Sequence, residues 1–195
     1  LANGNEFKFR ADGAWTLSYG AGCDVNVGET YTTYENGSNM KFVGEDGAYN
    51  IYFSLVDAKF YIETYISATT VEAAMSSFGF ANAALVETIT LDENITLTFE
   101  KGDASTAPTY YTSGEAVRLY QNGAIMTVDA GSRTISAIEI TFANNMYYVA
   151  ADSGELSEEA AVRTWTGSAS AVKFTCTGTT SSTRAYIKAI KVTYE

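Results

Sequence analysis

Residues 6–10 read Glu6-Phe7-Lys8-Phe9-Arg10, with aromatic and charged side chains in strict alternation. Successive side chains of a β-strand point to opposite faces, so this order places Phe7 and Phe9 on one face and Lys8 and Arg10 on the other. The same period of two recurs at residues 49–55, 95–99, 138–142 and 187–194. The pattern therefore predicts strands that bury one face and leave the other for solvent or a ligand.

Turn signals separate these strand candidates. Asp, Asn and Gly cluster at residues 12–13, 36–37, 46–47, 92–94, 101–103 and 122–123, and these residue types favour tight turns. Only residues 71–77 have a pattern typical of a helix, and that segment is short. Short strands at this spacing are typical of sandwiches and barrels rather than of alternating α/β units. The sequence therefore predicts an all-β fold made of β-sandwiches.

The best candidate for a domain boundary lies near residues 64–70. Residues 60–62 resemble a closing strand, and the small polar residues 67–70 resemble a connector. We therefore predict two domains, residues 1–66 and residues 67–195. The first is smaller than a typical independent sandwich, so we expect it either to be N-terminally incomplete or to lean on its neighbour.

Composition and charge argue against several classes of partner. Hydrophobic residues make up 46% and aromatic residues 13% of the chain, which is enough for packed cores. No apolar run approaches the roughly 18 residues that a membrane-spanning helix needs. The net charge is −11, with 9 acids and 4 bases up to residue 64 and 14 acids and 8 bases after it. Because both parts are acidic, we expect neither nucleic acid nor an anionic membrane surface as partner, and a neutral ligand fits better.

The residues of common active sites are missing or scattered. The chain has no histidine, which removes the usual general base, the Ser-His and Cys-His pairs, and imidazole zinc sites. Its acids lie mostly in turns, without the paired carboxylates of a glycosidase, and no nucleophile elbow, phosphate loop or EF-hand pattern occurs. We therefore predict a protein that is not an enzyme and needs no cofactor. The run Asp152-Ser153-Gly154 leaves a structural calcium open.

Two cysteines, Cys23 and Cys176, lie one in each predicted domain. A disulfide between them would join the two domains, and spacing alone does not establish one. The simpler interpretation is two free thiols, each buried as a small apolar side chain.

Four stretches of the first part carry a family resemblance, namely residues 5–10, 12–15, 37–41 and 46–55. In these stretches, about a third of the chain, the sequence resembles the β-sandwich modules of the SusE/SusF-type outer-membrane glycan-binding lipoproteins of Bacteroidetes. The resemblance implies a partial immunoglobulin-like sandwich that binds polysaccharide without acting on it.

Five stretches of the second part carry a second family resemblance, namely residues 95–102, 107–114, 117–120, 165–168 and 186–190. They are similar to a jelly-roll module of the galactose-binding-like type that recurs in large secreted Bacteroidetes proteins. This resemblance implies an accessory or surface binding module rather than an active site. Both resemblances imply an extracellular or outer-membrane location, as part of a longer secreted protein or lipoprotein with other modules.

The first candidate binding surface follows from the chemistry of sugars. Neutral sugars present apolar C–H faces and hydroxyl edges, so binding them takes exposed aromatic rings beside planar polar or charged groups. If the polar face of residues 6–10 is exposed, one small platform would be formed by Lys8, Arg10, Trp15 and Tyr19. A packing role is the alternative for the tryptophan.

Two more tyrosines, Tyr31 and Tyr34, flank a polar, threonine-rich loop. Aromatic rings exposed in a loop are reasonable candidates for stacking on sugar. The alternative is that one of these rings folds back over the edge of the sandwich.

In the second part, tyrosines occur as the adjacent pairs 110–111 and 147–148. On a strand, one member of each pair points inward and the other outward. Two outward tyrosines near an arginine would make a sugar site, and the candidates are Tyr110, Tyr111, Arg118 and Tyr148. The alternative is a core strand in which Arg118 merely pairs with an acid such as Asp152. Trp165, between two threonines, is expected in the core.

These observations predict non-catalytic capture of a starch-like or xylan-like polysaccharide, at a bacterial surface or as an accessory module of a secreted glycoside hydrolase. A structural or adhesive spacer without a glycan site is the alternative from another class. Exposed aromatic platforms would favour binding, whereas tyrosines that are all buried would favour the spacer.

Overall fold

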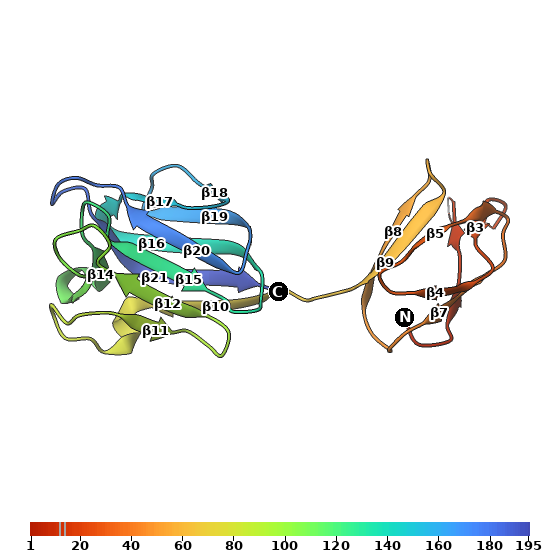
Figure 1. The fold of residues 1–195 in the computed structure, drawn as a ribbon, viewed down its shortest axis with the longest axis horizontal. Helices are drawn as coiled ribbons and strands as arrows, with labels where there is room; N and C mark the ends of the chain where they lie inside the picture. Colours follow the sequence, from red (N-terminus) through yellow and green to blue (C-terminus); the bar gives the residue numbers. More distant parts are fainter. Residues whose placement is uncertain (12, 14) are drawn as a thin grey trace. The chain divides into compact units, whose positions relative to one another are not determined.

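The computed structural model describes residues 1–11, 13 and 15–195, so Asp12 of the predicted turn at residues 12–13 and Ala14 lie outside the described residues. The chain divides into two compact units, Leu1–Ser67 and Ala68–Glu195. Both are built from strands, and the helical elements of the described part are two short 3₁₀ turns (Figure 1). The predicted all-β fold is confirmed. No helix in the described part of the chain is long and apolar enough to cross a bilayer.

The first unit contains three small sheets among its described residues. Its strands are β1 (Glu6–Phe7), β2 (Phe9–Arg10), β3 (Ser18–Gly20), β4 (Asp24–Asn26), β5 (Thr30–Thr32), β6 (Tyr34–Glu35), β7 (Met40–Val43), β8 (Tyr49–Ser54) and β9 (Lys59–Thr64). Strand β7 lies between β1 and β4, β3 lies between β2 and β6, and β9 lies between β5 and β8. The pairing of β4 with β7 is parallel, and the other pairings of this unit are antiparallel.

Aromatic rings hold the core of the first unit together. Phe9 stacks on Phe53 with 4.4 Å between ring centroids and meets Phe60 edge-on at 5.2 Å. Phe7 also packs edge-on against Phe60, at 6.1 Å. Phe7 and Phe9 therefore face one core while Arg10 is exposed, as the alternation predicts. Each such ring pair stabilises the unit by about 0.5–1.5 kcal/mol beyond the burial of its area.

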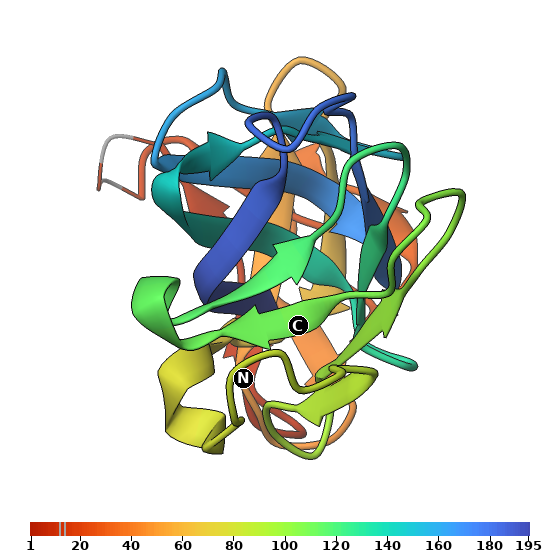
Figure 2. The same cartoon turned by 90° about the vertical axis from the view of Figure 1, so that its left-hand side faces the viewer.

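The second unit is a sandwich of two sheets. Its elements are β10 (Thr69–Ala74), η1 (Met75–Phe78), β11 (Thr88–Thr90), β12 (Thr96–Glu100), β13 (Thr109–Tyr111), η2 (Thr112–Gly114), β14 (Ala116–Leu119), β15 (Ile125–Asp129), β16 (Ile135–Tyr147), β17 (Val149–Ala151), β18 (Glu155–Leu156), β19 (Val162–Ala169), β20 (Ala171–Cys176) and β21 (Ala185–Tyr194). One sheet has the order β13-β14-β21-β16-β19-β18, with β10 also paired to β21, and the other has the order β11-β12-β15-β20-β17. Figure 2 views this unit from the side where η1 (yellow) and η2 (green) lie.

The segment predicted to be helical is a strand followed by a single 3₁₀ turn. Residues of β10 pair with β21 in antiparallel register, from Thr69 opposite Tyr194 to Ala74 opposite Ala189. Strand β21 is ten residues long and offers a full row of backbone partners, which outweighs the weak helical preference of residues 71–77. The helix prediction was wrong because this pairing joins segments that are far apart in sequence.

Trp165 lies at the centre of the second core, where its side chain is fully buried. Its indole N–H donates a hydrogen bond to the backbone carbonyl of Ser153. The backbone of Gly154 lies against the same ring, because a Cβ at this position would be 2.5 Å from ring atoms of Trp165. The expectation that Trp165 belongs to the core is confirmed, and Gly154 is required by this close approach.

The two cysteines differ in their surroundings, and both are free. Cys176 is 2% exposed at the end of β20, and its burial raises the pKa of the thiol. Cys23 is exposed just before β4, in which only Val25 is buried. The expectation of two buried thiols was therefore wrong for Cys23, which precedes a short strand with a single inward residue.

Arg163 is a buried cation held by backbone carbonyls. It is 7% exposed, and its guanidinium donates to the carbonyl of Ser157 at 2.7 and 3.0 Å, to that of Val149 at 2.8 Å and to that of Tyr147 at 3.2 Å. Burial lowers the pKa of this guanidinium, and the charge of Glu159 acts in the opposite direction. The side chain thereby joins β19 to the ends of β16 and β17 and to the loop that follows β18.

We predict that Arg163→Lys lowers the free energy of unfolding of the second unit by about 2–4 kcal/mol. A lysine ammonium cannot reach all three carbonyls, so buried acceptors lose their partners. Urea unfolding followed by Trp165 fluorescence in a Trp15→Phe background would measure this loss. The exposed Arg133 provides the control, since Arg133→Lys should leave the midpoint unchanged. Equal midpoints for Arg163→Lys and its parent would contradict the prediction.

Candidate functional site

The structure brings Lys8, Arg10 and Trp15 of the first unit together. The Trp15 side chain is 60% exposed. The Lys8 ammonium lies 5.6 Å from the centroid of its ring, and the Arg10 guanidinium carbon lies 5.0 Å from it. Cations at this distance are attracted to the face of an indole. They therefore help to hold an exposed ring in one orientation.

A pocket of about 530 Å³ lies beside this group. It is lined by Lys8, Phe9, Arg10, Ala11, Tyr19, Phe53 and Leu55. The ring of Tyr19 lies 5.5 Å from that of Phe53, which itself stacks on Phe9. The wall of the pocket is thus the outer part of the aromatic core, and its charged rim comes from β2 and the residue before it. We call this site the Trp15 pocket.

The size and lining of the Trp15 pocket suit a small ligand. Binding pockets usually have volumes of about 300–1,000 Å³, with mostly apolar walls and a few polar groups. Among the described residues, no carboxylate forms an ion pair with Lys8 or Arg10. Their N–H groups therefore stand at the rim of an apolar hollow, where they can donate to hydroxyl or carbonyl oxygens.

Tyr31 and Tyr34 have different environments. The Tyr31 ring stacks on Phe60 at 5.4 Å, and its hydroxyl donates to Glu29 at 2.6 Å and accepts from the backbone N–H of Asn26 at 2.8 Å. Burial and the Glu29 carboxylate raise the pKa of this hydroxyl. Tyr31 therefore folds back onto the sandwich, which was the alternative for this pair. Tyr34 lies on β6 with 64% of its side chain exposed.

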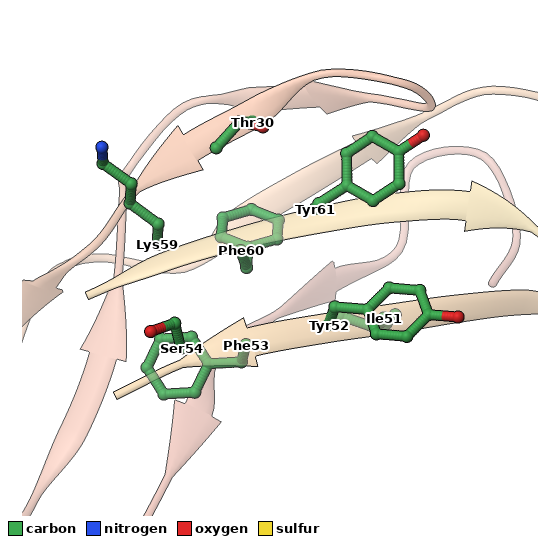
Figure 3. A pocket seen from close by; sticks show the side chains of 8 residues that line it. All are labelled: Thr30, Ile51, Tyr52, Phe53, Ser54, Lys59, Phe60 and Tyr61. Atoms are coloured by element: carbon green, nitrogen blue, oxygen red, sulfur yellow. The ribbon is translucent and has the colours of Figure 1, made fainter. Parts of the chain in front are cut away.

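A second aromatic surface, which the sequence analysis did not single out, lies on the outer face of β8 and β9 (Figure 3). Tyr52 and Tyr61 are opposite each other in the register of these strands, with 6.5 Å between ring centroids and 31° between ring planes. They line a shallow pocket of about 500 Å³ with Thr30, Ile51, Phe53, Ser54, Lys59 and Phe60. We call this surface the Tyr52–Tyr61 face.

Hydrogen bonds to one carboxylate fix the Tyr52 ring. The Tyr52 hydroxyl donates to Oε1 of Glu63 at 2.9 Å, and the amide of Asn50 donates to the same oxygen at 3.3 Å. The signal for this surface was present in residues 49–55, because an alternation that sends Tyr49 and Phe53 inward sends Asn50 and Tyr52 outward. The prediction from residues 49–55 used only the inward half of that pattern.

In the second unit, the adjacent residues Tyr110 and Tyr111 point to opposite faces. Tyr110 belongs to the core and is 5% exposed. Tyr111 packs on the outer face, where the Arg118 guanidinium carbon lies 3.5 Å from the centroid of its ring and 5.1 Å from that of Tyr186. Arg118 does not pair with Asp152, whose Oδ1 accepts the backbone N–H of Lys173 at 3.0 Å.

Tyr186 completes this group, which we call the Arg118 cluster. The rings of Tyr111 and Tyr186 are 5.8 Å apart in an edge-to-face arrangement. The pKa of Tyr111 lies below its usual value, because the Ser113 side chain hydrogen-bonds to it and because the Arg118 charge favours the phenolate. In the sequence, Tyr186 belongs to the stretch 186–190 that carries the jelly-roll resemblance, and it was not a candidate site residue, since its position opposite Arg118 depends on the pairing of β14 with β21.

Tyr148 does not join the Arg118 cluster through any ring or cation contact among the described residues. Its ring stacks on that of Tyr147, with centroids 5.2 Å apart and planes 29° apart. The expected inward and outward alternation was wrong for this pair. Tyr148 lies between β16 and β17, which belong to different sheets, and strand alternation does not continue through such a crossing.

The described residues contain no group of three His, Cys, Asp or Glu side chains that would hold a metal ion. In the run that left calcium open, the carboxylate of Asp152 binds the Lys173 amide and the carbonyl of Ser153 accepts from Trp165. These groups therefore have structural partners within the protein.

Comparison of the chain with protein-family models, with curated proteins and with solved structures gives no match. The function is therefore inferred from the fold and from the chemistry of the protein surface. They define an all-β protein in which the candidate surfaces are the Trp15 pocket, the Tyr52–Tyr61 face and the Arg118 cluster.

We predict that Glu63→Gln lowers the pKa of Tyr52 towards the usual tyrosine value. The hydrogen bond to Glu63 and the charge of this carboxylate both raise that pKa in the native protein, because a phenolate beside a carboxylate is disfavoured. Tyrosine ring carbon shifts followed by NMR against pH would measure it, with Tyr52→Phe assigning the signal. Tyr31, whose hydroxyl bonds to Glu29 and not to Glu63, should titrate identically in both proteins. An unchanged Tyr52 titration would show that the hydrogen bond to Glu63 does not form in solution.

Proposed function

We propose that this protein binds polysaccharide without catalysis and that the first unit holds the glycan. The observation that carries the proposal is the exposed Trp15 ring with Lys8 and Arg10 over it, because these two cations also line an apolar pocket of about 530 Å³. A sugar ring places its C–H face on an aromatic surface and its hydroxyls at the polar edge. The ligand class we favour is a neutral plant or storage glycan of the starch or xylan type.

The Tyr52–Tyr61 face offers a second contact for the same ligand class. Two rings 6.5 Å apart can each meet a sugar of one chain, and the 31° between their planes suits a twisted chain better than a flat crystalline surface. Lys59, Ser54 and Thr30 provide polar groups at its edge. Because Glu63 holds Tyr52 in place, little ring freedom is lost on binding.

Placement of exposed aromatic residues supports binding over a spacer role. A spacer has no need of exposed rings, whereas Trp15 and Tyr52 are 60% and 55% exposed. Exposed aromatic groups gathered beside polar groups are typical of interaction surfaces. The family resemblance of residues 5–10 and 46–55 points to the same function and to a secreted or surface-exposed protein.

We predict that Trp15→Ala weakens polysaccharide binding about tenfold, because stacking on one ring contributes about 1.4 kcal/mol. Affinity gel electrophoresis against starch, xylan, mixed-linkage glucan and mannan would measure the retardation of the full chain. Tyr34→Ala is the matched control, since it removes an equally exposed tyrosine outside the Trp15 pocket. The double variant Tyr52→Ala/Tyr61→Ala tests the second surface in the same gels.

Two outcomes would contradict the proposal. If no polysaccharide retards the wild-type protein, the spacer becomes the better interpretation. If retardation occurs but neither Trp15→Ala nor the double variant reduces it, the glycan binds outside the first unit. Thermal unfolding of each variant beside wild type separates loss of binding from loss of structure.

A further inference from the structure

Arg118 is a positive charge without a carboxylate partner among the described residues. No ion pair joins its side chain to any of them, and its side chain hydrogen-bonds to that of Tyr111. Nε is buried and lacks an acceptor. A guanidinium carries five donors, and in a folded protein such donors normally find acceptors. Here Nε has none, and the residue is half-buried rather than enclosed.

The other two stacked or buried arginines of this unit have an acceptor for Nε. Arg184 lies over the ring of Tyr120 at 4.8 Å, and its Nε donates to Gln121 at 2.6 Å. Arg163 donates to three backbone carbonyls. Near the Arg118 cluster, the carboxylate of Glu115 is already paired with Lys188 at 3.0 Å. Among the described residues, Arg118 is therefore the arginine that combines a ring-stacked guanidinium with a buried Nε that lacks an acceptor.

We propose that the Arg118 cluster binds the carboxylate of a uronic acid residue in an acidic glycan. A planar guanidinium matches a carboxylate in a bidentate pair, and its charge-assisted hydrogen bonds are about twice as strong as neutral ones. Stacking on Tyr111 at 3.5 Å, with the ring of Tyr186 at 5.1 Å, fixes the plane of the fork before the ligand arrives. Tyr186 is buried, so the half-buried ring of Tyr111 is the one that offers apolar surface for the C–H groups of the sugar.

The position of the cluster favours a sugar over an acidic peptide. Tyr186 lies on β21 and Arg118 on β14, and both strands are paired on both sides, whereas Tyr111 lies on the end strand β13. The outer edge of β13 is bonded at Tyr110 to the backbone of residues 83 and 84, so an extended peptide finds no free strand edge to pair with at the cluster. A ligand held by ring contacts and one carboxylate does not need such an edge.

The negative charge of the protein helps to interpret any binding of an acidic polymer. The chain has 23 acidic and 12 basic residues, so it repels a polyanion at long range. This repulsion is largely screened beyond about 8 Å at physiological salt, so short-range contacts then determine whether the polymer binds. Retention of an acidic polymer cannot be general ion exchange on such a protein.

The proposal rests on glycan binding as the function of the protein. It adds that the second unit also binds glycan and that the ligand of this unit is acidic. In a Trp15→Ala/Tyr52→Ala/Tyr61→Ala background, affinity electrophoresis would compare polygalacturonate and glucuronoxylan with the same polymers after reduction of their carboxyl groups to alcohols. We expect retardation by the acidic polymers and at least about tenfold weaker binding after reduction.

Variants of the arginine test the same contact from the protein side. Arg118→Gln and Arg118→Lys should each weaken binding to polygalacturonate about tenfold, since lysine keeps the charge but loses the planar fork. Arg184→Lys is the matched control and should have no effect, because that arginine is already bonded to Gln121. If Arg118→Gln changes the thermal unfolding of the protein, binding to polygalacturonate is compared for Arg118→Lys and wild type instead.

Each remaining outcome would overturn the proposal. Equal binding of acidic and reduced polymers would show that the carboxylate is not recognised. Unchanged binding by Arg118→Lys and Arg118→Gln would show that the arginine does not contact the ligand. Binding of poly-glutamate as tight as that of polygalacturonate would assign the site to acidic peptides. These failures are distinct from failure of the proposed function, in which no neutral glycan retards the protein with an intact first unit.

Discussion

Strand β14 sends Val117 and Leu119 into the core and Arg118 to the opposite face. The same alternation places Phe53 inward and Tyr52 outward on β8. The two-residue period of a β-strand thus decides both the core and the surfaces available for binding. A slip of one residue in either strand would exchange the two sets of side chains. Stability of the sandwich and exposure of the aromatic clusters therefore depend on one constraint, which is that the apolar half of each strand is buried.

The first unit combines its core and its candidate site more closely than the second does. Its fully buried apolar side chains are few, namely Val25, Met40, Phe42, Phe60 and Ile62. Around them, half-buried rings such as Phe9 and Phe53 supply much of the packing and also line the Trp15 pocket. Small units bury a lower fraction of their surface than large ones. Substitutions at Phe9 or Phe53 would therefore change stability and binding together, whereas Trp15 and Tyr52 report on binding alone.

The sequence predicted the features that depend on local pattern. Alternation at residues 6–10 identified the Phe7–Phe9 face and the cations beside Trp15, and the repeated alternation with its turn signals identified the all-β class. Features that depend on pairing between distant strands were not predicted from the sequence. Tyr186 meets Arg118 only because β21 pairs with β14, and residues 69–74 are a strand only because β21 also pairs with β10. The Tyr147–Tyr148 pair departs from alternation because the chain changes sheets there. Nothing in the local sequence marks that crossing.

The cations of this acidic protein lie on aromatic rings more often than on carboxylates. Lys8, Arg10, Arg118 and Arg184 each lie over a ring, whereas the ion pair among the described residues is that of Lys188 with Glu115. With 23 acids available, ion pairing would have been the simpler arrangement. A ring positions a cation through its face without occupying all of its N–H donors, so the donors stay available to a ligand. Contacts of this kind are individually weak. A polymer that meets several of them on one chain gains avidity, because each further contact forms at a high effective concentration.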